Sequence, residues 1–148
     1  LPQLADLLEA SFQKPLPPSF FTDIKPMVKS ILVAESGRGC AIVTNRQVTL
    51  SPERKESLAY LDKFAVHPAA QGEELGERLY EALVQAEPKL FWRSRSENRI
   101  NPWYFQRADG AYKQSVHPRK WTVFWRNIPD DTILPAIQAA IDIPPTFS

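Results

Sequence analysis

Hydrophobic residues recur with two different spacings along this chain, and the spacing predicts which segments form helices and which form strands. A spacing of three or four residues, typical of a helix with one buried face, occurs in residues 1–12 and 75–86. Residues 101–107 begin with Asn-Pro and should form a short helix, because proline suits a first helical turn. Residues 129–132 should cap a last helix. The apolar faces consist of Leu4, Leu7, Leu8 and Phe12 in the first helix, of Leu75, Leu79, Ala82, Leu83 and Ala86 in the second, and of Ile133, Ile137 and Ile141 in the last.

Other segments alternate apolar and polar residues or are rich in β-branched ones, and these patterns predict strands. The expected strands are residues 28–34, 40–48, 58–66, 90–95 and 120–126. His67-Pro68 should end the third strand, because proline cannot donate the hydrogen bond that continues a ladder.

Glycine, proline and polar residues mark the expected connections. Residues 36–39 (Ser-Gly-Arg-Gly) separate the first two strands, which predicts a β-hairpin. Residues 14–19 contain three prolines and should form a loop, and the polar, charged residues 47–57 are expected to be a connection. Residues 109–110 (Asp-Gly) are a turn signal, and the proline-rich tail after Ile143 is expected to fray. This order of elements predicts an α/β (α+β) fold with a central mixed, largely antiparallel sheet flanked by helices.

Composition narrows the class of protein. At 148 residues the chain can bury a substantial core, so we expect residues 1–148 to form a single domain. The 18 basic and 17 acidic residues give a net charge of +1, which provides no electrostatic case for nucleic-acid or membrane binding. Cys40 is the single cysteine and the histidines are isolated, so we expect no metal site. No apolar run is long enough to span a bilayer, so we expect a cytoplasmic protein. The chain starts at Leu1 rather than methionine, which suggests an excised piece of a longer protein.

The stretch LFWRSRSENRINPWYF, residues 90–105, carries the strongest chemical signal. Arg93 and Arg95 lie two apart on a predicted strand, so their side chains should share one face of the sheet. Two adjacent guanidinium groups repel each other, and a small anion such as a carboxylate would resolve the conflict. The alternative is a pair of solvated arginines matched to acidic neighbours.

A glycine-containing loop lies between the strand at 58–66 and the helix at 75–86. Its residues are Gln71, Gly72, Glu73, Glu74, Leu75 and Gly76. The first turn of a helix has unsatisfied N–H groups and a favourable dipole for anions, so this loop could bind a pyrophosphate. A plain turn before the helix is the alternative.

The loop pattern of Gln, two residues, a small residue, one residue and Gly resembles the acetyl-coenzyme A loop of the GCN5-related N-acetyltransferase (GNAT) superfamily. Three strings narrow the resemblance: YLDKF at residues 60–64, FWRSR at 91–95 and NPWYF at 101–105. In this order they resemble the acetyltransferase domain of the vertebrate-type N-acetylglutamate synthases, a family that includes bifunctional bacterial synthase/kinases. The resemblance is strong over residues 58–127 and weaker on the flanks.

The resemblance implies an enzyme that transfers the acetyl group of acetyl-CoA to the α-amine of L-glutamate, which is the entry step of arginine biosynthesis in microbes. The main chain of Phe64, Ala65 and Val66 would bind the pantetheine arm, and the amides of residues 71–76 would bind the pyrophosphate. The implied substrate contacts are Lys63, Arg93, Arg95 and Asn98. The implied catalytic residues are Tyr104, as general acid, and Asn98, which would donate to a carboxylate or orient the donor carbonyl. The chain departs from the superfamily loop at Glu74, where glycine is usual, and at Ala70, where relatives often carry a basic residue.

Other interpretations of the same residues stay open. Lys63 could extend toward solvent at a sheet edge, Asn98 could turn the chain after its strand, and Tyr104 could be a core residue. The family resemblance also implies an upstream amino-acid kinase domain and self-association into a homo-oligomer. A non-catalytic domain attached to an acetylglutamate kinase, serving regulation or assembly, is the second candidate, and transfer to a different acceptor is the third.

Overall fold

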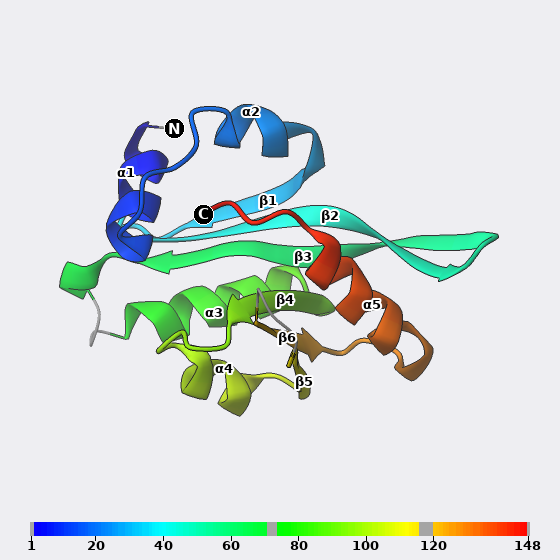
Figure 1. The fold of residues 1–148 in the computed structure, drawn as a ribbon. Coiled ribbons are helices and arrows are strands. Elements are labelled where there is room, and N and C mark those ends of the chain that lie inside the picture. The colour runs from blue at the N-terminus through cyan, green and yellow to red at the C-terminus, as the bar shows by residue number, and fades with distance from the viewer. Residues whose placement is uncertain (1, 71–73, 116–119, 148) are drawn as a thin grey trace. The chain divides into compact units, whose positions relative to one another are not determined.

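The computed structural model of this chain describes residues 2–70, 74–115 and 120–147. Among them, six strands follow the hydrogen-bonded order β1-β2-β3-β4-β6-β5 (Figure 1). The β3–β4 pair is parallel, while the β1–β2, β4–β6 and β5–β6 pairs are antiparallel, so the expected mixed, largely antiparallel sheet is confirmed. The elements in chain order are α1 (Pro2–Phe12), α2 (Phe20–Ile24), the 3-10 helix η1 (Lys25–Met27), β1 (Val28–Val33), β2 (Gly39–Ser51), β3 (Arg54–Val66), the 3-10 helix η2 (Pro68–Ala70), α3 (Leu75–Ala86), β4 (Leu90–Arg95), α4 (Asn101–Arg107), β5 (Gly110–Lys113), β6 (Trp121–Arg126) and α5 (Asp130–Asp142).

The chain groups into two compact units, and neither is continuous in sequence. Unit 1 comprises Leu1–Thr44, Leu61–Glu87 and Pro144–Ser148, and unit 2 comprises Asn45–Tyr60 and Pro88–Ile143. The strands β2 and β3 contribute residues to both units.

In unit 1, the helices α1 and α2 bury their apolar faces against strand residues. The ring of Phe12 at the end of α1 stacks on Phe147, with 5.0 Å between ring centroids. The tail expected to fray therefore packs as far as residue 147, because its aromatic ring has a partner. The buried cluster consists of Leu7, Leu8, Phe20, Ile24, Cys40, Ile42 and Ala65.

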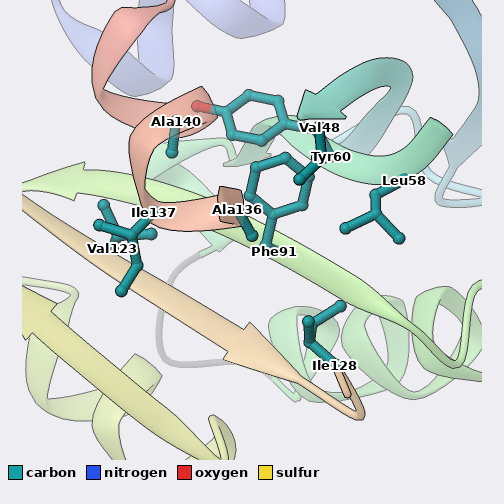
Figure 2. Packing of buried hydrophobic residues seen from close by; sticks show 9 residues of the cluster. All are labelled: Val48, Leu58, Tyr60, Phe91, Val123, Ile128, Ala136, Ile137 and Ala140. Atoms are coloured by element: carbon teal, nitrogen blue, oxygen red, sulfur yellow. The ribbon is translucent and has the colours of Figure 1, made fainter. Parts of the chain in front are cut away.

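In unit 2, α5 packs on β4 and β6 through small and β-branched residues (Figure 2). Tyr60 and Phe91 are partners in the parallel pairing of β3 and β4, and their rings meet edge to face with centroids 4.9 Å apart. Small residues on α5 allow the helix to approach these rings closely. The cluster consists of Val48, Leu58, Tyr60, Phe91, Val123, Ile128, Ala136, Ile137 and Ala140.

The expectation that residues 47–57 form a connection is wrong. Strand β2 continues to Ser51 and β3 begins at Arg54, so these residues form a hairpin closed at Pro52 and Glu53. Most of the side chains there are exposed or partly exposed, and Val48 is buried. Hydrogen bonds between main chains hold the two strands together, and these bonds need no apolar side chains. The polar side chains of residues 47–57 therefore suggested a loop.

Three shorter features also differ from expectation. The helix α2 was not predicted, and β5 begins at Gly110, where a turn was expected. Five and four residues are too short to show a period. The last helix begins with Pro129 at its N-cap position and no side-chain capping bond, so the expected side-chain cap is wrong. Instead, Asp130 and Asp131 place negative charge in the first turn, where the helix dipole favours it.

Candidate functional site

The start of α3 carries the described part of the predicted coenzyme loop; Gln71, Gly72 and Glu73 lie outside the described residues. Glu74 occupies the N-cap position without a side-chain capping bond. Its side chain is 87% exposed, and its Oε2 lies 4.0 Å from Nη1 of Arg78, one turn later. The carboxylate is therefore directed outward along the helix. The N–H groups of Leu75 and Gly76 belong to the first turn, which has no intrahelical acceptors.

The end of β3 lies beside α3 within unit 1. Phe64 and Ala65 are buried and Val66 is half-buried, and the ring of Phe64 meets Tyr80 of α3 edge to face. A Cβ atom added to Gly39 would lie 3.5 Å from the carbonyl oxygen of Ala65 and 3.4–3.5 Å from side chains of α3. These are ordinary contact distances, and they show that β2 passes beside the strand end and the helix that the resemblance assigns to coenzyme binding.

Lys63 is buried and ion-paired rather than extended into solvent. Its Nζ donates to Oδ1 of Asp62 at 2.8 Å and to the Asp62 carbonyl at 3.0 Å. The side chains of Lys63 and Asp62 are 10% and 5% exposed. The hydroxyl of Thr44 donates to the second Asp62 oxygen at 3.3 Å, and Nζ lies 5.5 Å from the ring of Phe20 and 6.0 Å from that of Phe147. The interpretation of Lys63 as a solvent-extended edge lysine is therefore wrong.

Arg93 and Arg95 share one face of β4, as expected from their spacing. Both guanidinium groups lie over the ring of Trp121, with Cζ 3.9 Å and 4.8 Å from its centroid. Nη1 of Arg93 also donates to the carbonyl oxygens of Ala140 and Ile143, at 2.7 Å and 2.5 Å, where α5 ends. Those carbonyls carry the negative end of the helix dipole, so they offset part of the charge of Arg93.

Asn98 lies in the turn between β4 and α4, and its side chain is exposed. Its backbone N–H donates to the carbonyl of Arg95 at 2.9 Å, and its Oδ1 accepts from the N–H of Ile100 at 3.2 Å. This is the turn-forming role that was the alternative to substrate binding. The buried Asn101, which was not selected from the sequence, donates from Nδ2 to the carbonyls of Arg95 and Ser96, and an Asn directly before a first-turn proline is its only signal.

Tyr104 lies in α4 within a buried aromatic cluster of unit 2. Its ring centroid is 5.4 Å from that of Trp92 and 5.3 Å from that of Phe124, and Trp103 contacts it from the same helix. The residue is 6% exposed, so the ring is part of the core. A core position and a reactive hydroxyl are compatible, because a packed ring holds its hydroxyl in a fixed direction.

No metal site is found among the described residues. No group of three or more His, Cys, Asp or Glu side chains in residues 2–70, 74–115 and 120–147 lies close enough to hold an ion. Burial raises the pKa of the Cys40 thiol to about 11, which keeps it protonated and unreactive at neutral pH. His117 lies outside the described residues.

Comparison with known proteins decides the family. The family profile described as "NAT, N-acetyltransferase, of N-acetylglutamate synthase" matches residues 1–142. This chain belongs to that acetyltransferase family. The relatives that this chain resembles carry different names. The mitochondrial N-acetylglutamate synthase of Homo sapiens is 38% identical over 128 residues, which are 86% of this chain and 22% of the relative. The acetylglutamate kinase of Xanthomonas campestris is 39% identical over 125 residues, 84% of this chain and 27% of the relative.

The match to a mitochondrial amino-acid acetyltransferase of Schizosaccharomyces pombe is 35% identical over 122 residues, covering 80% of this chain and 24% of the relative. The chain thus spans about a quarter of the length of these relatives. Among solved structures, Arabidopsis thaliana NAA60 with a bisubstrate analogue has a TM-score of 0.60 at 10% identity, covering 86% of this chain and 93% of the other. The same enzyme with acetyl-CoA has a TM-score of 0.58. These likenesses confirm the expected GNAT-like fold.

No helix in the described ranges combines the length and the hydropathy that crossing a membrane needs.

Proposed function

We propose that this NAT domain transfers the acetyl group of acetyl-CoA to the α-amine of L-glutamate and so produces N-acetyl-L-glutamate. The observation that carries the proposal is the match of residues 1–142 to the NAT domain of N-acetylglutamate synthase. The basic pair on β4 supports an acceptor with carboxylate groups, because arginine donors match a carboxylate in geometry and charge.

The proposed coenzyme contacts use main-chain groups. The amides of residues 71–76 would bind the pyrophosphate, and the main chain of Phe64, Ala65 and Val66 would bind the pantetheine arm. The outward direction of Glu74 toward Arg78 supports this assignment, because a carboxylate directed at a pyrophosphate would repel it. Acetyl-CoA supplies a thioester carbonyl that an amine can attack.

In the proposed reaction, the neutral amine of glutamate forms a bond to the thioester carbon, and the bond from that carbon to sulfur breaks. The departing thiolate takes a proton from the hydroxyl of Tyr104, and the amine proton leaves to water. Lys63, Arg93, Arg95 and Asn98 would contact the carboxylates of glutamate. Neutralising those carboxylates holds the amine in place for attack.

An acetylation assay with Tyr104→Phe tests the proposal. The wild-type protein should release free thiol from acetyl-CoA when glutamate is present, and mass spectrometry should detect N-acetylglutamate. Glutamine, which lacks the second carboxylate, should be a much poorer acceptor. The Phe variant keeps the ring in its aromatic cluster and removes the proton donor, so we expect kcat to fall about 10²-fold with the KM for glutamate unchanged. A folded wild-type protein that makes no N-acetylglutamate at saturating substrate concentrations would contradict the proposed function.

A regulatory or assembly role beside a kinase is the second candidate. The relative from Xanthomonas campestris is named acetylglutamate kinase, and Arg93 and Asn98 have structural contacts that need no substrate. Under this role the protein would bind its kinase partner and have no transferase activity. The assay above separates the two functions. An upstream amino-acid kinase domain, a homo-oligomer and a cytoplasmic location stay predictions.

A further inference from the structure

Trp121, which begins β6, contacts both members of the basic pair. The ladder between β4 and β6 pairs Arg95 with Trp121, Arg93 with Val123 and Phe91 with Trp125. Trp121, Val123 and Trp125 therefore share one face of β6, and Trp121 is 8% exposed. Trp121 stands at one end of this row, and its ring lies against both arginines.

The ring of Trp121 offsets the repulsion between the positive charges of Arg93 and Arg95. Two guanidinium groups on alternate residues of one strand repel each other, and each loses water when it is partly covered. An indole ring presents a negative face to a cation, and here one ring lies within 3.9 Å and 4.8 Å of both Cζ atoms. Stacking also fixes the planes of the guanidinium groups, and those planes set the directions of their N–H donors.

We propose that Trp121 is a positioning residue that orients Arg93 and Arg95 toward one anionic group of the acceptor. This inference rests on the proposed function, because it takes the acceptor to be a carboxylate-bearing amino acid. Without the ring, Arg93 still donates to the carbonyls of Ala140 and Ile143, but both guanidinium groups lose the surface that fixes their planes and offsets their repulsion. The acceptor must then order them at a cost in affinity. Trp121 therefore determines how well the acceptor binds and has no part in the transfer of the acetyl group.

Steady-state kinetics of two Trp121 variants test the proposal. Trp121→Leu removes the aromatic face, and we expect the KM for glutamate to rise about tenfold, with kcat and the KM for acetyl-CoA changed less than twofold. Trp121→Phe keeps an aromatic face and should recover most of the lost affinity. Partial rescue by phenylalanine is not expected from a residue that only fills space, because leucine and phenylalanine are both apolar fillers.

Trp125→Leu is the matched control. Trp125 lies on the same strand and face but opposite Phe91, and its ring covers Gly110 rather than an arginine. This variant should lower stability to a similar degree and leave the KM for glutamate within twofold of wild type.

The outcomes separate the two proposals. If the wild type acetylates glutamate and Trp121→Leu folds with an unchanged KM, or if Trp125→Leu raises the KM equally, the role of Trp121 is refuted and the proposed function stands. If Trp121→Leu does not fold, Trp121→Phe and Trp121→His test the role of Trp121 instead. KM values for glutamate equal to that of the wild type in both variants would support stacking. A tenfold rise in KM in both variants would refute it. A wild-type protein that does not acetylate glutamate overturns both proposals.

Discussion

Lys63 is a buried cation whose charge is balanced within its own strand. Asp62 accepts two hydrogen bonds from its ammonium, and Thr44 holds the other carboxylate oxygen of Asp62. Because both charged side chains are almost fully covered, neither can recover its hydration if the other is removed.

Lys63→Met should therefore destabilise the protein by about 3 kcal/mol, since it removes the ammonium that pairs with the buried Asp62 carboxylate. Urea denaturation measures the change. The double variant Asp62→Asn with Lys63→Met should recover most of the loss, because it also removes the buried carboxylate. Equal stability of the single and double variants would show that the ion pair contributes little.

Cys40 gives a prediction about pH. Its pKa in the folded protein is raised to about 11 from 9.0, so the native state binds this proton more tightly than the unfolded state does. The stability it contributes is complete below pH 9 and is lost as the pH rises toward 11. Cys40→Ala should lack this loss, which urea denaturation between pH 8 and about 10.5 would measure. A wild-type curve parallel to that of Cys40→Ala throughout this range would contradict the assigned burial.

At the level of elements, the strand β5 depends on the absence of a side chain at Gly110. The register pairs Gly110 with Trp125, and a Cβ atom there would lie 2.4 Å from Cζ2 of the indole. The large ring thus lies across the smallest residue, and the two strands can pair closely.

Gly110→Ala should cost about 1–3 kcal/mol, because the methyl group displaces Trp125 from its place beside the core. Thermal unfolding followed by circular dichroism measures the loss. Gly76→Ala is the matched control: its Cβ would lie at an ordinary 3.8 Å from Val66, and it should leave stability unchanged or slightly higher. Equal effects of the two substitutions would contradict the close packing at Gly110.

Elements with a clear period were predicted well from the sequence, and elements set by neighbouring strands were not. The strand β4 and the helix α4 occupy the predicted residues 90–95 and 101–107, because the residue pattern marks the strand and the Asn-Pro start marks the helix. The hairpin at residues 47–57 was missed because its strands are held by main-chain pairing between polar residues. The short strand β5 was missed because it depends on the pairing of Gly110 with Trp125, which local sequence does not encode.

For the candidate site, the sequence predicted the shared face of Arg93 and Arg95 but not their partners. The ring of Trp121 and the carbonyls that end α5 come from positions 26 or more residues away in sequence, and no local pattern joins them to the arginines. Likewise, YLDKF places Asp62 next to Lys63, yet alternation on a strand suggested opposite faces rather than an ion pair. Residue type and spacing identified candidate chemistry, and long-range packing determined what each group contacts.

At the scale of the whole molecule, ligand binding should be visible as stabilisation. A ligand that binds only the native state shifts the unfolding equilibrium by mass action. At 100 times its dissociation constant, acetyl-CoA should add about 2.7 kcal/mol and raise the Tm by roughly 5–10 °C for a chain of this size. Differential scanning fluorimetry measures the shift, and coenzyme A without the acetyl group is expected to act similarly. Adenosine, which lacks the pyrophosphate and pantetheine, serves as the control, and an equal shift with it would contradict the assigned coenzyme loop.

The stacking of Phe147 on Phe12 also bears on how the protein reaches its native state during synthesis. Unit 1 contains α1 and also residues 144–147, which are synthesised long after α1. The Phe12 ring therefore lacks its stacking partner until residue 147 has been synthesised. A nascent chain stalled before residue 147 should expose this aromatic surface to chaperones.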